Sequence, residues 1–271
     1  MHVLIILVSC FFATTGMTSP LVQSIARQEI VVHGKKAYEI RCSGCHGIKG
    51  DGNGEATPFL SPKPRDFTSG VFKFRSSALG TLPSDQDLMA TISKGIAGTS
   101  MPAFPDVPEQ ERFAIVQYIK SFSENWKANE NFGPVVQGTS VPTEDFKNYK
   151  TFIARAERGK KLFIESCVLC HGTHGKGDGE GSVDLVDDWN QPILPANLTK
   201  LSIKTGKSIQ DIYKTLLVGV NGTPMSSYKD VYSDDQLWDI TAWVLYLRGV
   251  HNGIYDSSNP PISMIKPEEV Q

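Results

Sequence analysis

The sequence has no apolar run, apart from a short one at its N-terminus, that approaches the roughly 20 residues needed for a helix to cross a bilayer. Its 27 basic and 29 acidic residues leave a formal charge of −2, without the basic excess typical of nucleic-acid-binding proteins. Convincing alternation of apolar and polar residues, the pattern of half-buried strands, is also missing. We therefore expect an all-α fold, no stable membrane span and no nucleic-acid partner.

Cysteine is scarce, and its placement would make a poor disulfide framework. Of the five cysteines, Cys10 lies in the N-terminal apolar segment. The other four form two C-x-x-C pairs, and a histidine follows each pair. These motifs are Cys42, Cys45 and His46 in the first half, and Cys167, Cys170 and His171 in the second. In an oxidising compartment unprotected dithiols would form disulfides. C-x-x-C-H is instead the attachment motif of a covalent c-type haem, so we expect two covalently bound haem c groups.

Residues 1–19 have the features of a signal peptide. The apolar run over 3–13 is too short to span a bilayer and is followed by small residues, although no Lys or Arg precedes it. We expect an exported, periplasmic protein. Lipidation at Cys10 is the alternative, but it would leave an abnormally short leader.

An internal repeat organises the rest of the chain. Residues 34–56 align with 159–181 at an offset of 125, and the similarity continues through PRDFT (64–68) with PANLT (195–199). Later segments match as well, 87–104 with 211–228 and 111–122 with 236–247. The chain is thus a module of about 110 residues used twice, too long a period for a solenoid. We expect a first domain over 20–140 and a second over 141–271.

Each copy has the same predicted helix order. Apolar periodicity and N-cap residues such as Ser84 and Ser208 indicate three helices per copy. The predicted helices cover 31–41, 85–94 and 108–122 in the first copy, and 155–166, 208–218 and 233–248 in the second.

A methionine in a Gly-Thr-x-Met segment occurs once in each copy. Met101 and Met225 lie 55 and 54 residues after His46 and His171. A thioether sulfur suits a haem iron that serves in electron transfer. We expect His46 with Met101, and His171 with Met225, to be the axial ligands. Met89 has tyrosine at its counterpart in the other copy, and we expect it to fill the core.

The paired C-x-x-C-H and G-T-x-M segments, in this helix order, resemble class I c-type cytochromes in a tandem dihaem form. The resemblance covers about residues 31–124 and 150–250. It implies two cytochrome c-like domains, each a few helices around a covalent haem, that pass electrons between redox protein partners. FKFRS (72–76) with G-x-L-P (80–83), present only in the first copy, resembles modules that serve as electron-transfer subunits of periplasmic oxidoreductases.

Buried haem propionates need hydrogen-bond donors or charge, and Arg65, Arg75 and Trp189 are the residues we expect to supply them. Two other cofactors fit the same segments less well. A zinc site would use His174, but the first copy has Lys49 at that position. A calcium site in the Gly-Asp-rich segments 50–55 and 175–181 lacks the EF-hand spacing.

A dihaem enzyme, either peroxidase-like or sulfur-compound-oxidising, is the alternative function. A peroxidase needs an iron with an open position, whereas each copy here has its own methionine. Thiosulfate-oxidising dihaem enzymes use a cysteine thiolate as an iron ligand, and no cysteine remains beyond the attachment motifs and the leader.

Overall fold

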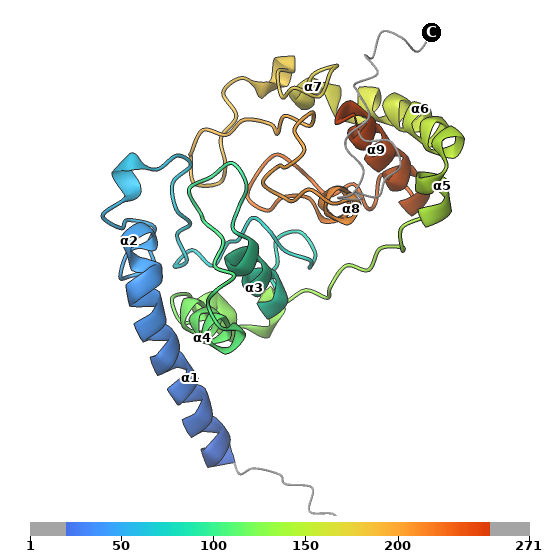
Figure 1. The fold of residues 1–271 in the computed structure, drawn as a ribbon. Coiled ribbons are helices and arrows are strands. Elements are labelled where there is room, and N and C mark those ends of the chain that lie inside the picture. Colours follow the sequence, from blue (N-terminus) through green and yellow to red (C-terminus); the bar gives the residue numbers. More distant parts are fainter. Residues whose placement is uncertain (1–19, 250–271) are drawn as a thin grey trace, which may run out of the picture.

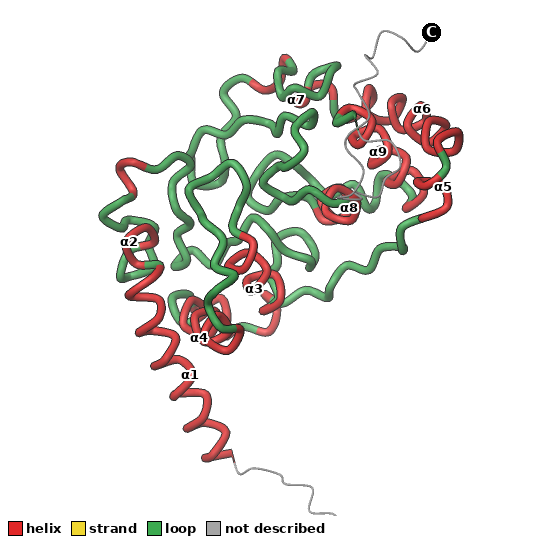
Figure 2. Tube along the Cα trace, in the orientation of Figure 1, coloured by secondary structure: helices red, strands yellow, loops and turns green. Residues whose placement is uncertain are grey.

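The computed structural model describes residues 20–249, so the predicted signal segment with Cys10, and residues 250–271, lie outside the described part. Within it, helices alternate with long loops, and the β-type pairings are isolated bridges. Figure 2 shows how much of the chain is loop between the helices. The predicted all-α class is confirmed.

The two copies contain the same three principal helices. The first copy holds α1 (Pro20–Arg41), α2 (Ser43–His46), α3 (Asp85–Lys94) and α4 (Glu109–Lys120). The second holds α5 (Thr143–Lys147), α6 (Tyr149–Ser166), α7 (Val168–His171), α8 (Ile209–Val218) and α9 (Asp234–Leu247). Short 3₁₀ turns lie at Thr57–Phe59, Glu124–Lys127, Asn129–Asn131 and Glu180–Ser182.

Local capping explains where the middle helices begin. The Ser84 hydroxyl accepts a hydrogen bond from the backbone N–H of Asp87, whose carboxylate in turn accepts from the backbone N–H of Ser84. Ser208 and Asp211 form the same capping box at the start of α8. Because each box satisfies two backbone donors that a helix end leaves unpaired, the predicted starts are confirmed to within a residue.

Helix α1 is longer than predicted, since it begins at Pro20 instead of residue 31. Proline suits the first turn of a helix, where its missing N–H is no loss. Residues 21–29 are exposed, the apolar Leu21, Val22 and Ile25 among them, so this stretch is helical without being buried in the core. In Figure 1 it projects away from the rest of the first copy. None of the helices among residues 20–249 combines the length and apolarity required to cross a membrane.

Each copy builds a separate core from its first and last principal helices. α1 packs against α4, and α6 packs against α9. The first core centres on Tyr38, Ile115 and Val116, and the second on Phe163 and Leu237, all of them almost fully buried. Two independent cores agree with a module that is used twice.

The connection between the copies packs against both of them. Val136 N donates to Ser76 O of the first copy at 2.8 Å. Further along, Thr139 N donates to the Tyr213 hydroxyl at 3.0 Å, and Trp238 Nε1 donates to Thr139 Oγ1 at 2.9 Å. The connecting segment therefore does not behave as a free linker, because its ends are hydrogen-bonded to different copies.

Candidate haem sites

Each Cys-x-x-Cys-His motif forms a tight turn at the end of the first principal helix. In the first copy Cys42 N donates to Tyr38 O at 2.8 Å, and His46 N donates to Cys42 O at 2.9 Å. In the second copy the corresponding bonds, from Cys167 N to Phe163 O and from His171 N to Cys167 O, are both 2.8 Å. The helical turn brings the cysteines and the histidine of each motif together.

A backbone carbonyl fixes the orientation of each histidine ring. His46 Nδ1 lies 3.0 Å from Arg65 O, and His171 Nδ1 lies 3.0 Å from Ala196 O. With the proton on Nδ1 donated to these carbonyls, Nε2 carries the free lone pair that binds a metal. Burial lowers the pKa of both rings, which favours the neutral form that a metal requires.

The two carbonyls occupy matching positions in the repeat. Arg65 follows Pro64 in PRDFT, and Ala196 follows Pro195 in PANLT. These two segments align in the repeat, and their alignment is the sequence signal that marks the two carbonyls as equivalent.

Within residues 20–249 no cluster of metal-binding side chains supports the zinc or calcium alternative, and two of the thiols differ in pKa from those of a reactive dithiol. Burial raises the pKa of Cys42 and of Cys167 to about 12, opposite to the lowered pKa of reactive C-x-x-C thiols. His174 is exposed, and no group of three or more His, Cys, Asp or Glu side chains within residues 20–249 could hold a metal ion. Asp51, a ligand of the calcium alternative, instead accepts from Asn53 N at 3.1 Å.

A glycine-rich loop folds back over each motif. Gly54 N donates to Cys45 O and Gly179 N donates to Cys170 O, both at 3.2 Å. A Cβ at Gly54 would lie 2.3 Å from Gly44 O, and one at Gly179 would lie 2.2 Å from Leu169 O. The glycines are therefore required by the close approach of this loop to the backbone of the motif.

The two methionine loops have the same hydrogen bonds. In the first copy Met101 N donates to Thr99 Oγ1 at 3.1 Å, and Ile96 N donates to Met101 O at 3.1 Å. In the second, Met225 N donates to Thr223 Oγ1 at 3.2 Å, and Val220 N donates to Met225 O at 2.8 Å. The threonine of Gly-Thr-x-Met thus holds the backbone on which the methionine is presented.

The three residues predicted to contact propionates lie where the two copies meet. The Arg65 guanidinium carbon is 3.6 Å from the Trp189 ring centroid. Arg75 is buried, and its Nη2 donates to Val218 O of the second copy at 2.9 Å. Burial lowers the pKa of Arg65 to about 10, although Asp187 and Asp66 attract its charge, so it stays cationic at neutral pH.

One buried donor at this place fits the carboxylates of a haem. Arg75 Nη1 is shielded from solvent and has no hydrogen-bond partner within the described chain. An unpaired buried guanidinium N–H is costly, and an anionic oxygen is the group that would satisfy it. The residues present therefore fit the predicted cofactor, while the assignment of Arg65, Arg75 and Trp189 to propionates stays a prediction.

An aromatic ring that the sequence analysis missed lies against the first histidine. Phe67 stacks on His46 with ring centroids 4.5 Å apart and an interplanar angle of 19°. Leu198 occupies the equivalent position of the second copy. The repeat gave no signal for this contact, because the residue differs between the copies.

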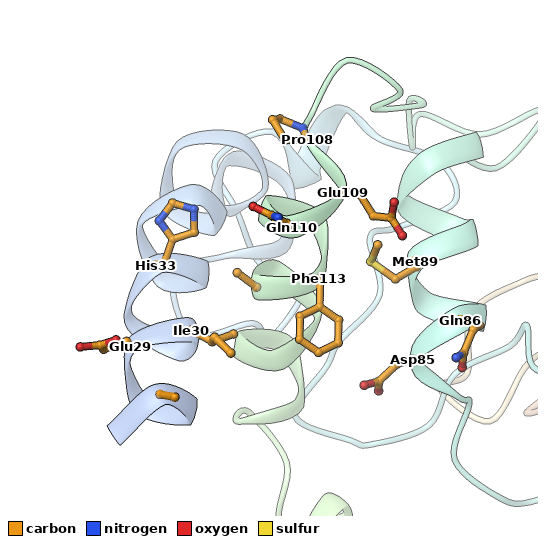
Figure 3. A pocket seen from close by; sticks show the side chains of 12 residues that line it. Glu29, Ile30, His33, Asp85, Gln86, Met89, Pro108, Glu109, Gln110 and Phe113 are labelled. Atoms are coloured by element: carbon orange, nitrogen blue, oxygen red, sulfur yellow. The ribbon is translucent and has the colours of Figure 1, made fainter. Parts of the chain in front are cut away.

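A cavity in the first copy lies apart from these motifs. It has a volume of about 1110 Å³ and opens between α1, α3 and α4, with His33, Met89 and Phe113 among its lining residues. Figure 3 shows these side chains around it. None of the cysteines, histidines and methionines predicted to hold haem lines this cavity, so we assign it no part in the haem sites.

Comparison with known proteins points to one family. The model of the cytochrome c family matches residues 31–123 and again residues 156–248. A chain of the reducing HAO-like protein complex from Kuenenia stuttgartiensis has a similar structure, with a TM-score of 0.72 and 37% identity. The similarity covers 79% of the present chain and 95% of that one.

Curated relatives are redox proteins of several kinds. The cytochrome c subunit of the cytochrome bc1 complex of Corynebacterium diphtheriae is 26% identical over 80% of this chain. The FixPc subunit of the cbb3-type cytochrome c oxidase of Rhizobium leguminosarum is 28% identical over 60%. A thiosulfate dehydrogenase of Psychrobacter arcticus is 23% identical over 77%. The matches span 66%, 47% and 56% of these relatives' own lengths.

Proposed function

Because the chain belongs to the cytochrome c family in both of its halves, we propose that it transfers electrons between redox proteins through two His/Met-ligated haems. Two cytochrome c domains imply two covalent haem c groups. In the proposal Cys42 and Cys45 anchor one haem, which His46 and Met101 ligate. The second copy supplies the equivalent set, namely Cys167, Cys170, His171 and Met225. The main observation in support of the proposal is that the same hydrogen bonds hold the histidine and the methionine loop in each copy.

The haem iron supplies a reversible one-electron change, and the protein keeps the coordination constant while it occurs. The carbonyls of Arg65 and Ala196 hold Nδ1 of each histidine, so that the ring cannot rotate away. Thr99 and Thr223 hold the backbone of each methionine. Since both ligand loops are fixed in advance, little rearrangement accompanies a change of charge.

The solved structure most relevant to a partner is the HAO-like protein complex, because this chain covers 95% of the similar component. That coverage supports the proposal that the protein is the electron-transfer component of a periplasmic redox complex. Relatives that are subunits of respiratory complexes support the same class of partner. Purification from the native periplasm should recover a second redox protein. If the chain emerges alone under gentle conditions, it is a free carrier instead of a fixed component.

Replacing Met101 or Met225 with alanine should abolish His/Met ligation in one copy only. The far-red charge-transfer band of ferric His/Met haem, which the family resemblance implies, should fall by about half in each single variant and vanish in the double variant. Absorption spectroscopy of the oxidised protein measures this directly. Met89→Ala is the matched control, because Met89 packs against the first core and should keep the full band. A full band in both ligand variants would show that the ligands are assigned wrongly.

A sulfur-compound-oxidising enzyme is the second candidate, favoured by the thiosulfate dehydrogenase among the relatives. The cysteines within the described residues all belong to the two attachment motifs, which leaves no thiolate there to ligate iron. We therefore expect thiosulfate not to reduce the protein, whereas a small inorganic reductant should reduce both haems. Rapid reduction by thiosulfate in a stopped-flow experiment would establish the enzymatic function instead.

A further inference from the structure

Arg65 links the first iron ligand to the second copy. Its carbonyl oxygen accepts the hydrogen bond from His46 Nδ1, at 3.0 Å. Its guanidinium lies over the Trp189 ring, with the guanidinium carbon 3.6 Å from the ring centroid. Arg65 thus accepts a hydrogen bond from the predicted iron ligand His46 through its backbone carbonyl. Its side chain packs over Trp189 of the second copy.

Trp189 in turn contacts the methionine loop of the second copy. A Cβ built at Gly222 would lie 2.8 Å from the Trp189 ring, so the ring lies directly against this backbone. Asp188 N also donates to Gly222 O at 3.1 Å. Gly222 opens the Gly-Thr-x-Met segment that ends in Met225. At the matching Gly98 of the first copy, a Cβ would meet no described heavy atom within 4 Å.

An ion pair between the copies holds the tryptophan loop in place. Asp187 Oδ1 accepts from Trp189 N at 3.0 Å, and Oδ2 pairs with Lys73 Nζ at 2.7 Å. The side chains are only 19% exposed for Lys73 and 4% for Asp187, which limits screening of the pair by solvent. Burial alone would raise the pKa of Asp187, but the bonds from Lys73 and from backbone N–H groups outweigh it and keep the pKa below its usual value.

The segment 72–80, distinctive of the first copy, holds the same methionine loop from another side. Asn221 N donates to Lys73 O, and Gly80 N donates to Asn221 Oδ1, both at 3.1 Å. Arg75 Nη2 donates to Val218 O. This segment, which differs between the copies, therefore contributes to docking them together.

We propose that Arg65 and Trp189 form the junction for electron exchange between the two haem sites. The route runs from His46 through the Arg65 carbonyl and guanidinium to the Trp189 ring, and from there to the Gly222–Met225 backbone. Electron tunnelling weakens steeply across empty space and less through bonded and closely packed atoms, and every step here is a bond, a hydrogen bond or a packing contact. One electron leaves the site that is oxidised and reaches the site that is reduced, with no bond made or broken. The inference rests on the proposed function, since it takes His46 and Met225 as iron ligands.

The test compares variants of the two-haem protein. After rapid photochemical reduction of one haem, the rate at which the electron redistributes between the haems is measured. Trp189→Leu should slow this redistribution by about tenfold or more, and Trp189→Phe, which keeps a ring, should slow it less. Gly222→Ala should also slow it, because the added methyl group displaces the Trp189 ring.

Gly98→Ala is the matched control. The φ of 71° at Gly98 is close to the 68° at Gly222, so alanine strains the backbone at both positions. Only Gly222→Ala places a methyl group against the Trp189 ring. The charge-transfer band and the reduction potential of each haem are recorded for every variant. Unchanged redistribution in Trp189→Leu and Gly222→Ala, with both bands and potentials intact, overturns the junction alone. A wild-type protein without the two His/Met bands overturns the proposed function itself.

Discussion

Replacing Cys167 and Cys170 together with alanine should yield a protein that carries one covalent haem instead of two. The thiols lie at the end of α6 and in the α7 turn and are unpaired in the described structure, so both are available for thioether bonds. Without these bonds the haem of the second copy becomes extractable or is lost. Acid–organic extraction followed by mass spectrometry should show a mass lower by one haem group, and the haem absorbance per chain should fall by about half.

The first copy offers the reciprocal experiment. Cys42→Ala with Cys45→Ala should remove the other haem, and the four-cysteine variant should retain none. His174→Ala is the control, because His174 is exposed and aligned with Lys49, so both haems should remain. If a double-cysteine variant kept both haems after extraction, or if the wild-type protein contained zinc, the assignment of the attachment sites would be wrong.

The repeat allowed the local parts of both sites to be predicted. The C-x-x-C-H turn and the Gly-Thr-x-Met loop are short segments whose hydrogen bonds close within a few residues, so their sequence determines their shape. The capping boxes at Ser84 and Ser208 are local for the same reason. Two copies of each motif removed alternatives that one copy would have left open, among them a zinc site with His174.

Contacts between the copies could not be predicted in this way. Arg65 and Trp189 are each predicted to contact propionates, but the sequence did not indicate that the Arg65 guanidinium lies over the Trp189 ring. Lys73 and Asp187 are 114 positions apart and have no repeated counterpart that would mark them as a pair. Such contacts depend on how the two folded copies pack against each other, and this arrangement leaves no local pattern in the sequence.

An ionic network around the buried Arg155 and Asp239 of the second copy was not predicted, for a related reason. Arg155 is 7% exposed and bonds to Asp145, Asp235 and Asp239, while Arg158 bonds to Asp239 from the other side. Charged residues on a helix are usually interpreted as a solvated face. Here they join α5, α6 and α9, and the first copy achieves the equivalent α1–α4 packing without this network.

Replacing Gly159 with valine should destabilise the second copy more than any single surface change. An added Cβ would lie 1.9 Å from Asp239 O of α9, a distance that forces α6 and α9 apart. The expected loss is about 3 kcal/mol of unfolding free energy, because overpacking of a helix contact shifts backbone as well as side chains. Denaturant unfolding monitored by circular dichroism measures it. A Cβ added at Gly34 would lie 1.9 Å from Ala114 O of α4, so Gly34→Val should destabilise the first copy similarly.

Gly44→Ala is the control for these two variants. It tests whether a loss of stability comes from the steric overlap of the added side chain or from replacing any glycine. Gly44 is helical, a Cβ there would meet no described atom within 4 Å, and the second copy already has Leu169 at this position. Alanine should therefore leave stability unchanged or raise it by up to about 1 kcal/mol through its higher helix propensity. Equal losses in Gly44→Ala and Gly159→Val would contradict the close helix contact. A loss of stability in Gly34→Val and Gly159→Val, but not in Gly44→Ala, would show that an equivalent glycine allows the close helix packing in each copy. That packing positions the helix whose end forms the Cys-x-x-Cys-His turn.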